Sequence, residues 1–343
     1  MGFIRQNRTR VRTDFGYPMN LRAYFTRGII WGQRQLFSRL LKKSCHRSIP
    51  PDFVGQDAND AIRSILEKGE PCLVARFGCV EFEAVLRGYD ISRKCSTLAK
   101  SLRLFTGGSG PFWWDNSIKA GLLRTAGVFP ATDDVLMRFS ERSIEDARQL
   151  DVLGSWNARE LEFQKKFFPG AKAVRLDDLL PFFFKRPWSM ALKGKHVLVV
   201  HPFDKTIRGQ YEKRGGLFLD PLVLPDFQLT VYRPVTSFLG LKTPFRDWFE
   251  ALEKMCGDIA KLDFDVALLG CGAYGMPLGA FIKRDMHKQA VHLGGATQLL
   301  FGIKGRRWDS WPAFSRFYND NWTRAGEEET PVNFKQHEGG AYW

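Results

Sequence analysis

Short apolar runs, each closed by turn-forming residues, recur along this chain of 343 residues. Such runs are typical of strands buried on both faces of a parallel sheet. The pattern predicts strands at residues 72–77, 134–139, 174–176, 196–201, 229–235, 265–269 and 289–293. Apolar residues at three- and four-residue spacing predict helices at 57–68, 79–87, 92–105 and 244–262. Because strands alternate with helices, we expect an α/β fold: a Rossmann-like, mostly parallel sheet with helices on both faces.

Four of the predicted strands end in residues suited to ligand binding. Arg76, His201, Gly270 and His292 each stand where an apolar run stops. In open α/β sheets, ligands bind outside the carboxyl ends of the strands, which share one edge. The sequence therefore predicts a single crevice, although His201 is also open to a role as a core histidine. The candidate lining residues are Arg76, Phe77, Gly78, His201, Gly270, Gly272, Tyr274, Gly275, His292, Gly294 and Gly295.

Residues 264–304 hold two strand–loop–helix units, the first with a G-x-G-x-x-G spacing at Gly270, Gly272 and Gly275. Glycines in such a loop let backbone N–H groups approach a phosphate at a helix N-terminus. Tight packing of the strand against the helix explains the same glycines, and spacing alone does not separate the two readings. A nicotinamide dinucleotide needs an acid about 20 residues further on, for the ribose. His292 stands there instead, so NAD is not expected.

A helix with basic residues near its start is predicted directly after His201. Asp204 can begin this helix, and Lys205 and Arg208 follow within it. Cations at a helix start suit a phosphate group. With the glycine loops they favour an anionic ligand, and a diphosphate more than a carboxylate. A nucleotide-sugar, held with Mg²⁺ or Mn²⁺, matches this description.

The net charge of +14 is concentrated at one end of the chain. Residues 1–50 contain eleven Lys or Arg and one acid, Asp14, and so hold +10. The remainder shows no dense basic face, so nucleic acid is not an expected partner. Within residues 21–43, apolar and basic positions alternate at helical spacing, which predicts a basic amphipathic helix. Docking on an anionic membrane surface and packing against its own domain both remain open for this helix.

Cysteine usage and hydropathy bear on the compartment. The six cysteines form no C-x-x-C pair and no Cys/His cluster at zinc spacing, as expected for reduced thiols in the cytoplasm. No apolar run reaches the 18 residues of a membrane span, and the N-terminus has no secretory pattern. We therefore expect a cytoplasmic protein, bound peripherally to the inner face of the plasma membrane if the arm docks there. The predicted organisation is a basic arm (1–50), one domain (51–310) and a loosely ordered tail (311–343).

The segment LVARFGCVEFEAV, residues 73–85, resembles the (I/V)-x-R-(F/Y)-G-D-G-E segment found in glycosyltransferases of the GT-D fold. VVHPFDKTIRGQY, LGCGAYGMPLGAFIK and AVHLGGATQLLFGIKG extend this similarity to the family's bacterial relatives in polysaccharide biosynthesis. The resemblance covers about residues 50–308 and is most specific in the C-terminal third. It implies a Rossmann-like domain that transfers a sugar, most simply from a UDP-sugar, to a glycan or lipid-linked acceptor.

The resemblance also implies roles for individual residues. The family uses a D-x-E motif around a divalent metal, so Glu81 is the expected catalytic and metal-binding residue, with Mn²⁺ or Mg²⁺ as cofactor. Cys79 stands where the first acid of the motif is expected, and one carboxylate is a poor site for a hard cation. A non-catalytic nucleotide- or glycan-binding subunit of a polysaccharide assembly system is therefore the alternative function. In the catalytic reading, Arg76, Lys205 and Arg208 neutralise the diphosphate.

Overall fold

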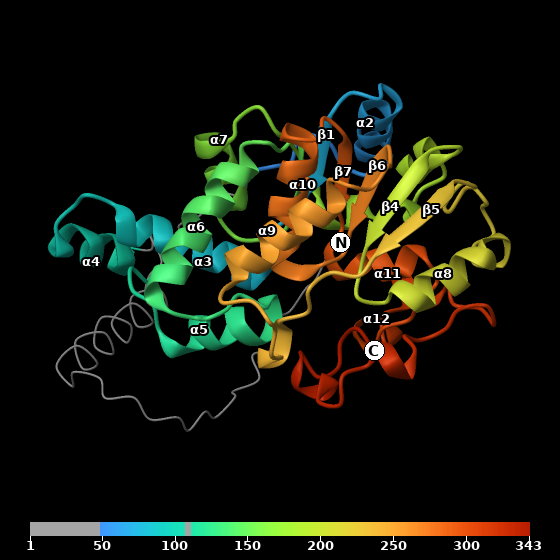
Figure 1. The fold of residues 1–343 in the computed structure, drawn as a ribbon. Helices are drawn as coiled ribbons and strands as arrows, with labels where there is room; N and C mark the ends of the chain where they lie inside the picture. The colour runs from blue at the N-terminus through green and yellow to red at the C-terminus, as the bar shows by residue number, and fades with distance from the viewer. Residues whose placement is uncertain (1–48, 107–110) are drawn as a thin grey trace. The chain divides into compact units, whose positions relative to one another are not determined.

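A wholly parallel, seven-stranded sheet forms the centre of the protein (Figure 1). The computed structural model describes residues 49–106 and 111–343. The strands follow the order β3-β2-β1-β7-β6-β4-β5 across the sheet. Their bounds are β1 Cys72–Ala75, β2 Val152–Ser155, β3 Lys172–Arg175, β4 His196–Val200, β5 Gln228–Tyr232, β6 Val266–Leu269 and β7 Gln289–His292. The predicted α/β class with a parallel sheet is confirmed.

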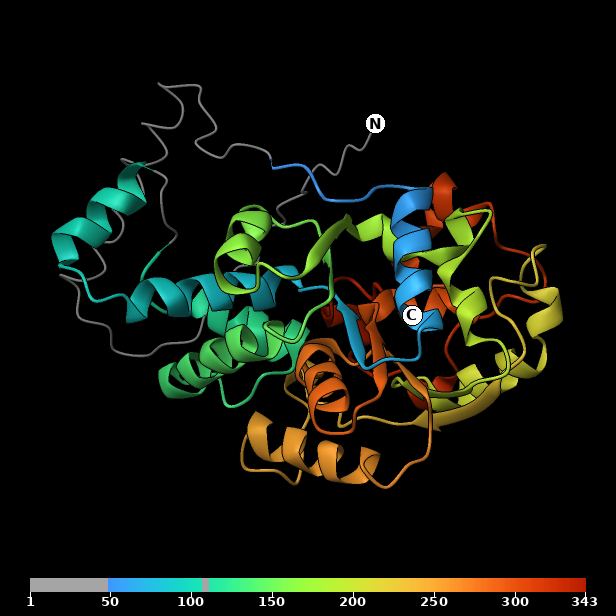
Figure 2. The same ribbon diagram turned by 90° about the horizontal axis from the view of Figure 1, so that it is seen from above.

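Alternate residues of each strand face opposite sides of the sheet, and both sides are buried. Leu73 and Ala75 of β1 join one apolar cluster, whereas Cys72 and Val74 join the other. Strands buried in this way read as continuous apolar runs, which is why the sequence pattern located them. Figure 2 shows α9 and α10 (orange) on one side of the sheet and α2 (blue) on the other.

Helices connect the strands, and several of them cover the two faces of the sheet. Their bounds are α2 Gln56–Glu67, α3 Cys79–Ser92, α4 Thr97–Thr106, α5 Asn116–Gly121, α6 Asp133–Ala147, α7 Glu160–Phe167, α8 Asp204–Glu212, α9 Trp248–Ile259, α10 Gly275–Arg284, α11 Thr297–Leu300, α12 Arg306–Asp309 and α13 Pro312–Ser315. The first cluster receives α3, α6, α9 and α10, and the second receives α2, α8 and the segment after β7. The sheet is therefore covered as in a doubly wound fold.

Two local predictions were wrong. Residues 134–139 lie in α6, where the Thr132 hydroxyl accepts a hydrogen bond from the Val135 N–H and so caps the helix. The apolar run in that segment belongs to a longer helical face. Helix α3 also continues through Gly88, where a side chain would collide with Ser140 of α6. This glycine permits close helix packing and does not end the helix.

The C-terminal residues pack against the sheet unit and do not form the loosely ordered tail that was expected. Trp322 and Trp343 are buried, and both belong to the second apolar cluster. The Trp343 ring lies 5.8 Å from that of Phe203 and 5.9 Å from that of Phe238, measured between centroids. Aromatic residues in this polar segment therefore supply the burial that fixes it.

The chain divides into two compact units. The larger comprises residues 46–94 and 110–343 and contains the sheet; the smaller comprises residues 1–45 and 95–109, of which α4 is the described part. The predicted amphipathic helix at 21–43 lies outside the described residues. None of the helices in the described ranges combines the length and the apolar character needed to cross a bilayer.

Candidate functional site

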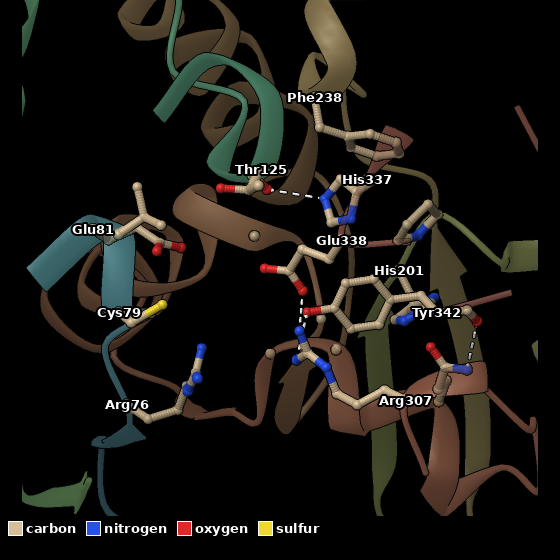
Figure 3. Close-up of a pocket in the computed structure, with 18 of the residues that line it drawn as sticks. Arg76, Cys79, Glu81, Thr125, His201, Phe238, Arg307, His337, Glu338 and Tyr342 are labelled. Carbon is tan, nitrogen blue, oxygen red and sulfur yellow. Dashed lines mark hydrogen bonds and ion pairs between the residues drawn. The ribbon is translucent and has the colours of Figure 1, made fainter. Parts of the chain in front are cut away.

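A cavity of about 140 Å³ opens at the carboxyl edge of the sheet. It is lined by Arg76, Trp156, His201 and Gly270, which directly follow β1, β2, β4 and β6, and by His292, the last residue of β7. The four predicted strand ends therefore do lie around one cavity. Figure 3 shows Arg76, Cys79 and Glu81 on one side of this cavity, and Arg307, Glu338 and Tyr342 on the other.

Arg76 lines the cavity and has no hydrogen bond or ion pair with any residue in the described part of the chain. Its Nε is buried without a hydrogen-bond partner, although the Glu81 carboxylate is close enough to interact with its charge. Its guanidinium carbon lies 5.3 Å from the centroid of the Trp156 ring, which holds the side chain from one side. Gly294 lies close on another side, since a Cβ there would stand 3.2 Å from an Arg76 nitrogen. A positioned cation whose hydrogen-bond donors no carboxylate accepts is suited to an anionic ligand.

Glu81 stands in the first turn of α3, beside the same cavity. Its carboxylate folds back over Gly78, where a Cβ would come within 1.9 Å of Oε2. Gly78 is therefore required for this side chain's position. Burial raises the pKa of the Glu81 carboxyl, and the positive charge of Arg76 partly opposes that shift. A carboxyl with a raised pKa can accept and return a proton closer to neutral pH than an ordinary glutamate.

Cys79 begins α3 and lines the cavity. Loss of solvent around its sulfur raises the pKa of the thiol, and the neighbouring Glu81 carboxylate raises it further. The thiolate is the nucleophilic form of cysteine, so this environment disfavours the reactive species. Cys79 stands at the position where the predicted D-x-E motif would place an acid, and its surroundings do not favour a thiolate.

His201 and His292 are both buried, and their Nε2 atoms differ, since one is a hydrogen-bond donor and the other an acceptor. The Phe203 N–H donates to His201 Nδ1 over 3.0 Å, so in the neutral ring the proton is on Nε2. His292 Nδ1 lies 3.0 Å from the Leu269 carbonyl oxygen, which can only accept, so its proton is on Nδ1. Burial lowers the pKa of His201 to about 3 and that of His292 to about 4. Both rings are therefore neutral at pH 7, one with a donor and one with an acceptor at Nε2.

The glycines of the G-x-G-x-x-G loop divide into two groups. A Cβ at Gly270 would stand 2.4 Å from the His201 ring, and one at Gly275 would stand 2.1 Å from the His292 ring. These two glycines admit the histidines. Gly272 has a positive φ of 59° and lines the cavity. Packing therefore explains the outer glycines of the motif, and only the middle one meets the backbone requirement of a ligand loop.

The end of the chain supplies a wall of the cavity that the sequence did not predict. His337 donates from Nε2 to the Thr125 carbonyl oxygen over 3.1 Å, and its Nδ1 is buried without a partner. Glu338 pairs with Arg307, whose guanidinium also bonds the Tyr342 hydroxyl over 3.1 Å. Tyr342 packs on Gly295, where a Cβ would meet its ring at 2.0 Å. This wall therefore depends on specific contacts with residues after β7.

Comparison with protein-family models, with curated proteins and with solved structures found no match for this chain. The expected membership of the GT-D family stays a prediction from the residues.

Several predicted ligand residues lie elsewhere. The Lys205 ammonium pairs with Glu328, and the start of α8 is capped by Glu329, which accepts from the Lys205 N–H over 2.7 Å. Arg208 donates to the Val231 carbonyl oxygen over 2.7 Å. Neither cation lines the cavity. Carboxylates of residues 328 and 329 occupy the helix start that a phosphate was expected to use, and Arg208 is bonded to the backbone of β5.

Phe77 and Tyr274 also belong to the protein interior. The Phe77 ring packs in the first apolar cluster, and only its carbonyl oxygen reaches toward the site, where it accepts from Trp156 Nε1 over 2.8 Å. The Tyr274 ring stacks on Trp248 with centroids 5.1 Å apart, and its hydroxyl lies 3.1 Å from that of Ser237. Both residues therefore support the cavity from behind.

A divalent metal does not fit the donor set around Glu81. A hard cation takes about six oxygen ligands, usually with more than one carboxylate. Within the described ranges no group of three His, Cys, Asp or Glu side chains is placed to hold a metal. Glu83, the nearest alternative in sequence, bonds Arg87 over 2.5 Å, and Glu338 pairs with Arg307. We therefore derive no step that involves a metal at Glu81.

Proposed function

We propose that this protein is a glycosyltransferase that moves a sugar from a nucleotide-sugar, most simply a UDP-sugar, to a glycan or lipid-linked acceptor. The observation that carries the proposal is the unpaired Arg76 at the carboxyl edge of a parallel sheet. A diphosphate would neutralise this cation and satisfy its buried Nε. The resemblance to bacterial transferases of polysaccharide synthesis supports the same assignment.

The lining of the cavity suggests how such a donor would lie. Phe203, Phe238 and Trp343 form an aromatic end near β4, which suits a nucleobase. Arg76, at the end of β1, lies three strand positions from β4, about 14 Å away at roughly 4.8 Å per strand. In this arrangement the diphosphate reaches Arg76 and the sugar lies beside Glu81. The buried Nδ1 of His337 and the Nε2 of His292 then supply acceptors for hydroxyl groups.

The proposed reaction needs only groups that this chain and the substrates contain. An acceptor hydroxyl oxygen attacks the anomeric carbon and forms the new glycosidic C–O bond. The bond from that carbon to the diphosphate oxygen breaks, and the nucleoside diphosphate leaves with the electron pair. Glu81 receives the proton of the hydroxyl, for which its raised pKa suits it. Arg76 stabilises the negative charge on the leaving diphosphate.

Donor binding is tested by titration calorimetry of the full chain with UDP, GDP and NAD. Arg76→Gln should weaken UDP binding by about 10- to 100-fold, since a charged hydrogen bond contributes roughly 1.5–3 kcal/mol. Arg148→Gln is the matched control, because Arg148 pairs with Glu145 on α6 and its side chain is half exposed. Equal UDP affinity in wild type and Arg76→Gln would refute the assignment, and binding of NAD alone would replace it with a dehydrogenase-type ligand.

The second candidate function, a non-catalytic binding subunit, is favoured by Cys79 in place of the acid. It predicts that UDP-sugars bind but are neither transferred nor hydrolysed. In the catalytic reading, Glu81→Gln should reduce turnover by about 10²- to 10⁴-fold and leave UDP affinity nearly unchanged. Slow hydrolysis of a bound UDP-sugar by wild type, lost in Glu81→Gln, would exclude the passive subunit.

A further inference from the structure

A second cavity, of about 400 Å³, lies at the carboxyl ends of β2 and β3. It is lined by the loop after β2, the start of α7 and the chain before α2, with Trp156, Asn157, Ala158, Leu161 and Arg175 among its residues. Trp156 lines this cavity and the one around Arg76. The two cavities are therefore neighbours along the same sheet edge, with one indole between them.

Trp156 is held in place and yet remains accessible. Its indole N–H donates to the Phe77 carbonyl oxygen over 2.8 Å, and its backbone N–H donates to Glu160 Oε2 over 2.8 Å. Arg76 covers the ring from one side. The residue is nevertheless 37% exposed, in contrast with the buried Trp188 and Trp248. A rigid aromatic surface of this kind costs little conformational entropy when a ligand stacks on it.

The loop that carries Trp156 is built around one buried carboxylate. Glu160, which is fully buried, accepts hydrogen bonds from Ser155 Oγ, from the backbone N–H groups of Trp156 and Asn157, and from Asn157 Nδ2. All four donors precede Glu160 by five residues or fewer. The carboxylate thus fixes the loop and is itself satisfied, so the cavity's shape does not depend on a ligand.

The chemistry of the second cavity suits a sugar ring. Leu161 and Val174 give it apolar walls beside the indole, while Asn157 and Arg175 are polar groups at its surface. A pyranose has the same division, with C–H groups on its faces and hydroxyl groups around its edge. An indole matches the face. The side-chain oxygen of Asn157, whose amide nitrogen donates to Glu160, and the largely exposed guanidinium of Arg175, which also pairs with Asp178, match the edge.

We propose that the cavity between β2, β3 and α7 binds the saccharide acceptor, with Trp156 as its stacking surface. The inference rests on the proposed function and adds to it the acceptor's place and class. The order of strands gives the geometry: β3 and β2 carry the acceptor cavity, Arg76 and the α3 residue Glu81 follow β1, and β7, β6 and β4 carry the remainder of the donor cavity. An acceptor hydroxyl that projects past Trp156 then meets the donor sugar beside Glu81.

The test uses the full chain, with p-nitrophenyl glycosides of glucose, galactose and N-acetylglucosamine as acceptor probes. Ala158→Trp fills the second cavity from an exposed position, and Ala260→Trp makes the same change at an exposed residue after α9. Saturation-transfer NMR should detect a glycoside on wild type and on Ala260→Trp. Ala158→Trp should weaken that binding by at least about tenfold, as should Trp156→Ala, whereas Trp156→Phe should retain most of it.

Calorimetry with UDP is run on the same variants and reports on the donor cavity separately. UDP affinity within about twofold of wild type in Ala158→Trp is expected. If no glycoside of the panel binds wild type, or if one binds equally well to Ala158→Trp, the acceptor assignment is overturned while the donor assignment stands. Failure of UDP to bind wild type would overturn the proposed function, whatever the glycosides do.

Discussion

Gly275 offers a sharp test of the contact between the glycine loop and His292. Its backbone has φ −62° and ψ −44°, which alanine adopts readily, so an effect of Gly275→Ala would be purely steric. The added Cβ would stand 2.1, 2.2 and 2.6 Å from three atoms of the His292 ring. The ring is buried and bonded to the Leu269 carbonyl oxygen, so it cannot move without losing that bond.

The cost of Gly275→Ala follows from these contacts. Overpacking of a buried site costs about 1–3 kcal/mol, and a broken hydrogen bond adds about 1 kcal/mol, for a total of roughly 2–4 kcal/mol. Gly257→Ala is the matched control, because Gly257 lies inside α9 with no atom within 4 Å of its added Cβ. That change should stabilise the protein by about 0.5–1 kcal/mol, the helix preference of alanine over glycine.

Urea unfolding followed by far-UV circular dichroism measures both variants against wild type. Opposite signs are expected, with Gly275→Ala less stable and Gly257→Ala slightly more stable, and with similar dependence on urea. If Gly275→Ala proves as stable as wild type, the close approach of His292 is wrong. The explanation of Gly275 as a packing glycine would then be withdrawn in favour of a ligand role.

Three further changes test other contacts. Burial lowers the pKa of His201 from 6.5 to about 3, so between these pH values the unfolded chain binds more protons and the protein becomes less stable as the pH is lowered. Lowering the pH from 7.5 to 5 should therefore cost the wild type about 2 kcal/mol of unfolding free energy through this histidine. His201→Gln should lose correspondingly less when urea unfolding is compared at the two pH values. Glu329→Ala removes the α8 cap and should destabilise by about 0.5–2 kcal/mol in thermal unfolding, whereas Glu327→Ala, an exposed neighbour, should change little. If the protein is catalytic as proposed, Cys79→Ser should retain turnover within about threefold, because loss of solvent around the sulfur and the neighbouring Glu81 carboxylate raise the pKa of the thiol; complete loss of activity would instead indicate a nucleophilic cysteine.

Strands β1, β4, β6 and β7 could be predicted because they are buried on both faces and therefore appear as uninterrupted apolar runs. The wrong prediction at residues 134–139 shows the limit of that signal, since a short apolar run inside an amphipathic helix looks the same. Thr132, followed by two acids, was the available indication of a helix start there. β2 was missed because its four residues, Val152–Ser155, include a glycine, which lowers the apolar contrast.

The site residues also divide into those that a local sequence pattern reveals and those that only the fold brings together. Arg76, His201 and His292 could be located because each follows a recognisable strand and parallel strands share an edge. The wall from residues 337–343 could not, because its packing depends on contacts with Gln298 and Arg307 that no local pattern encodes. The same holds for Lys205, whose charge suggested a phosphate until Glu328 and Glu329 were found at the helix start. Trp322 and Trp343, which are buried, were the local indication of this packing, whereas Trp311 is 44% exposed.

The pairing of β1 with β7 has a consequence for the order in which the protein can fold. Cys72 lies opposite Gln289, so the first strand and the last, more than 200 residues apart, meet in the middle of the sheet. At ribosomal rates of about 5–20 residues per second, one edge of β1 waits roughly 10–40 s for its partner. β1, β2 and β3 can pair during that interval, as can β4 and β5. Arg76 and Gly294 come together only when the two halves join, so the ligand cavity forms at the final, slowest pairing step and nascent chains carry an open strand edge until then.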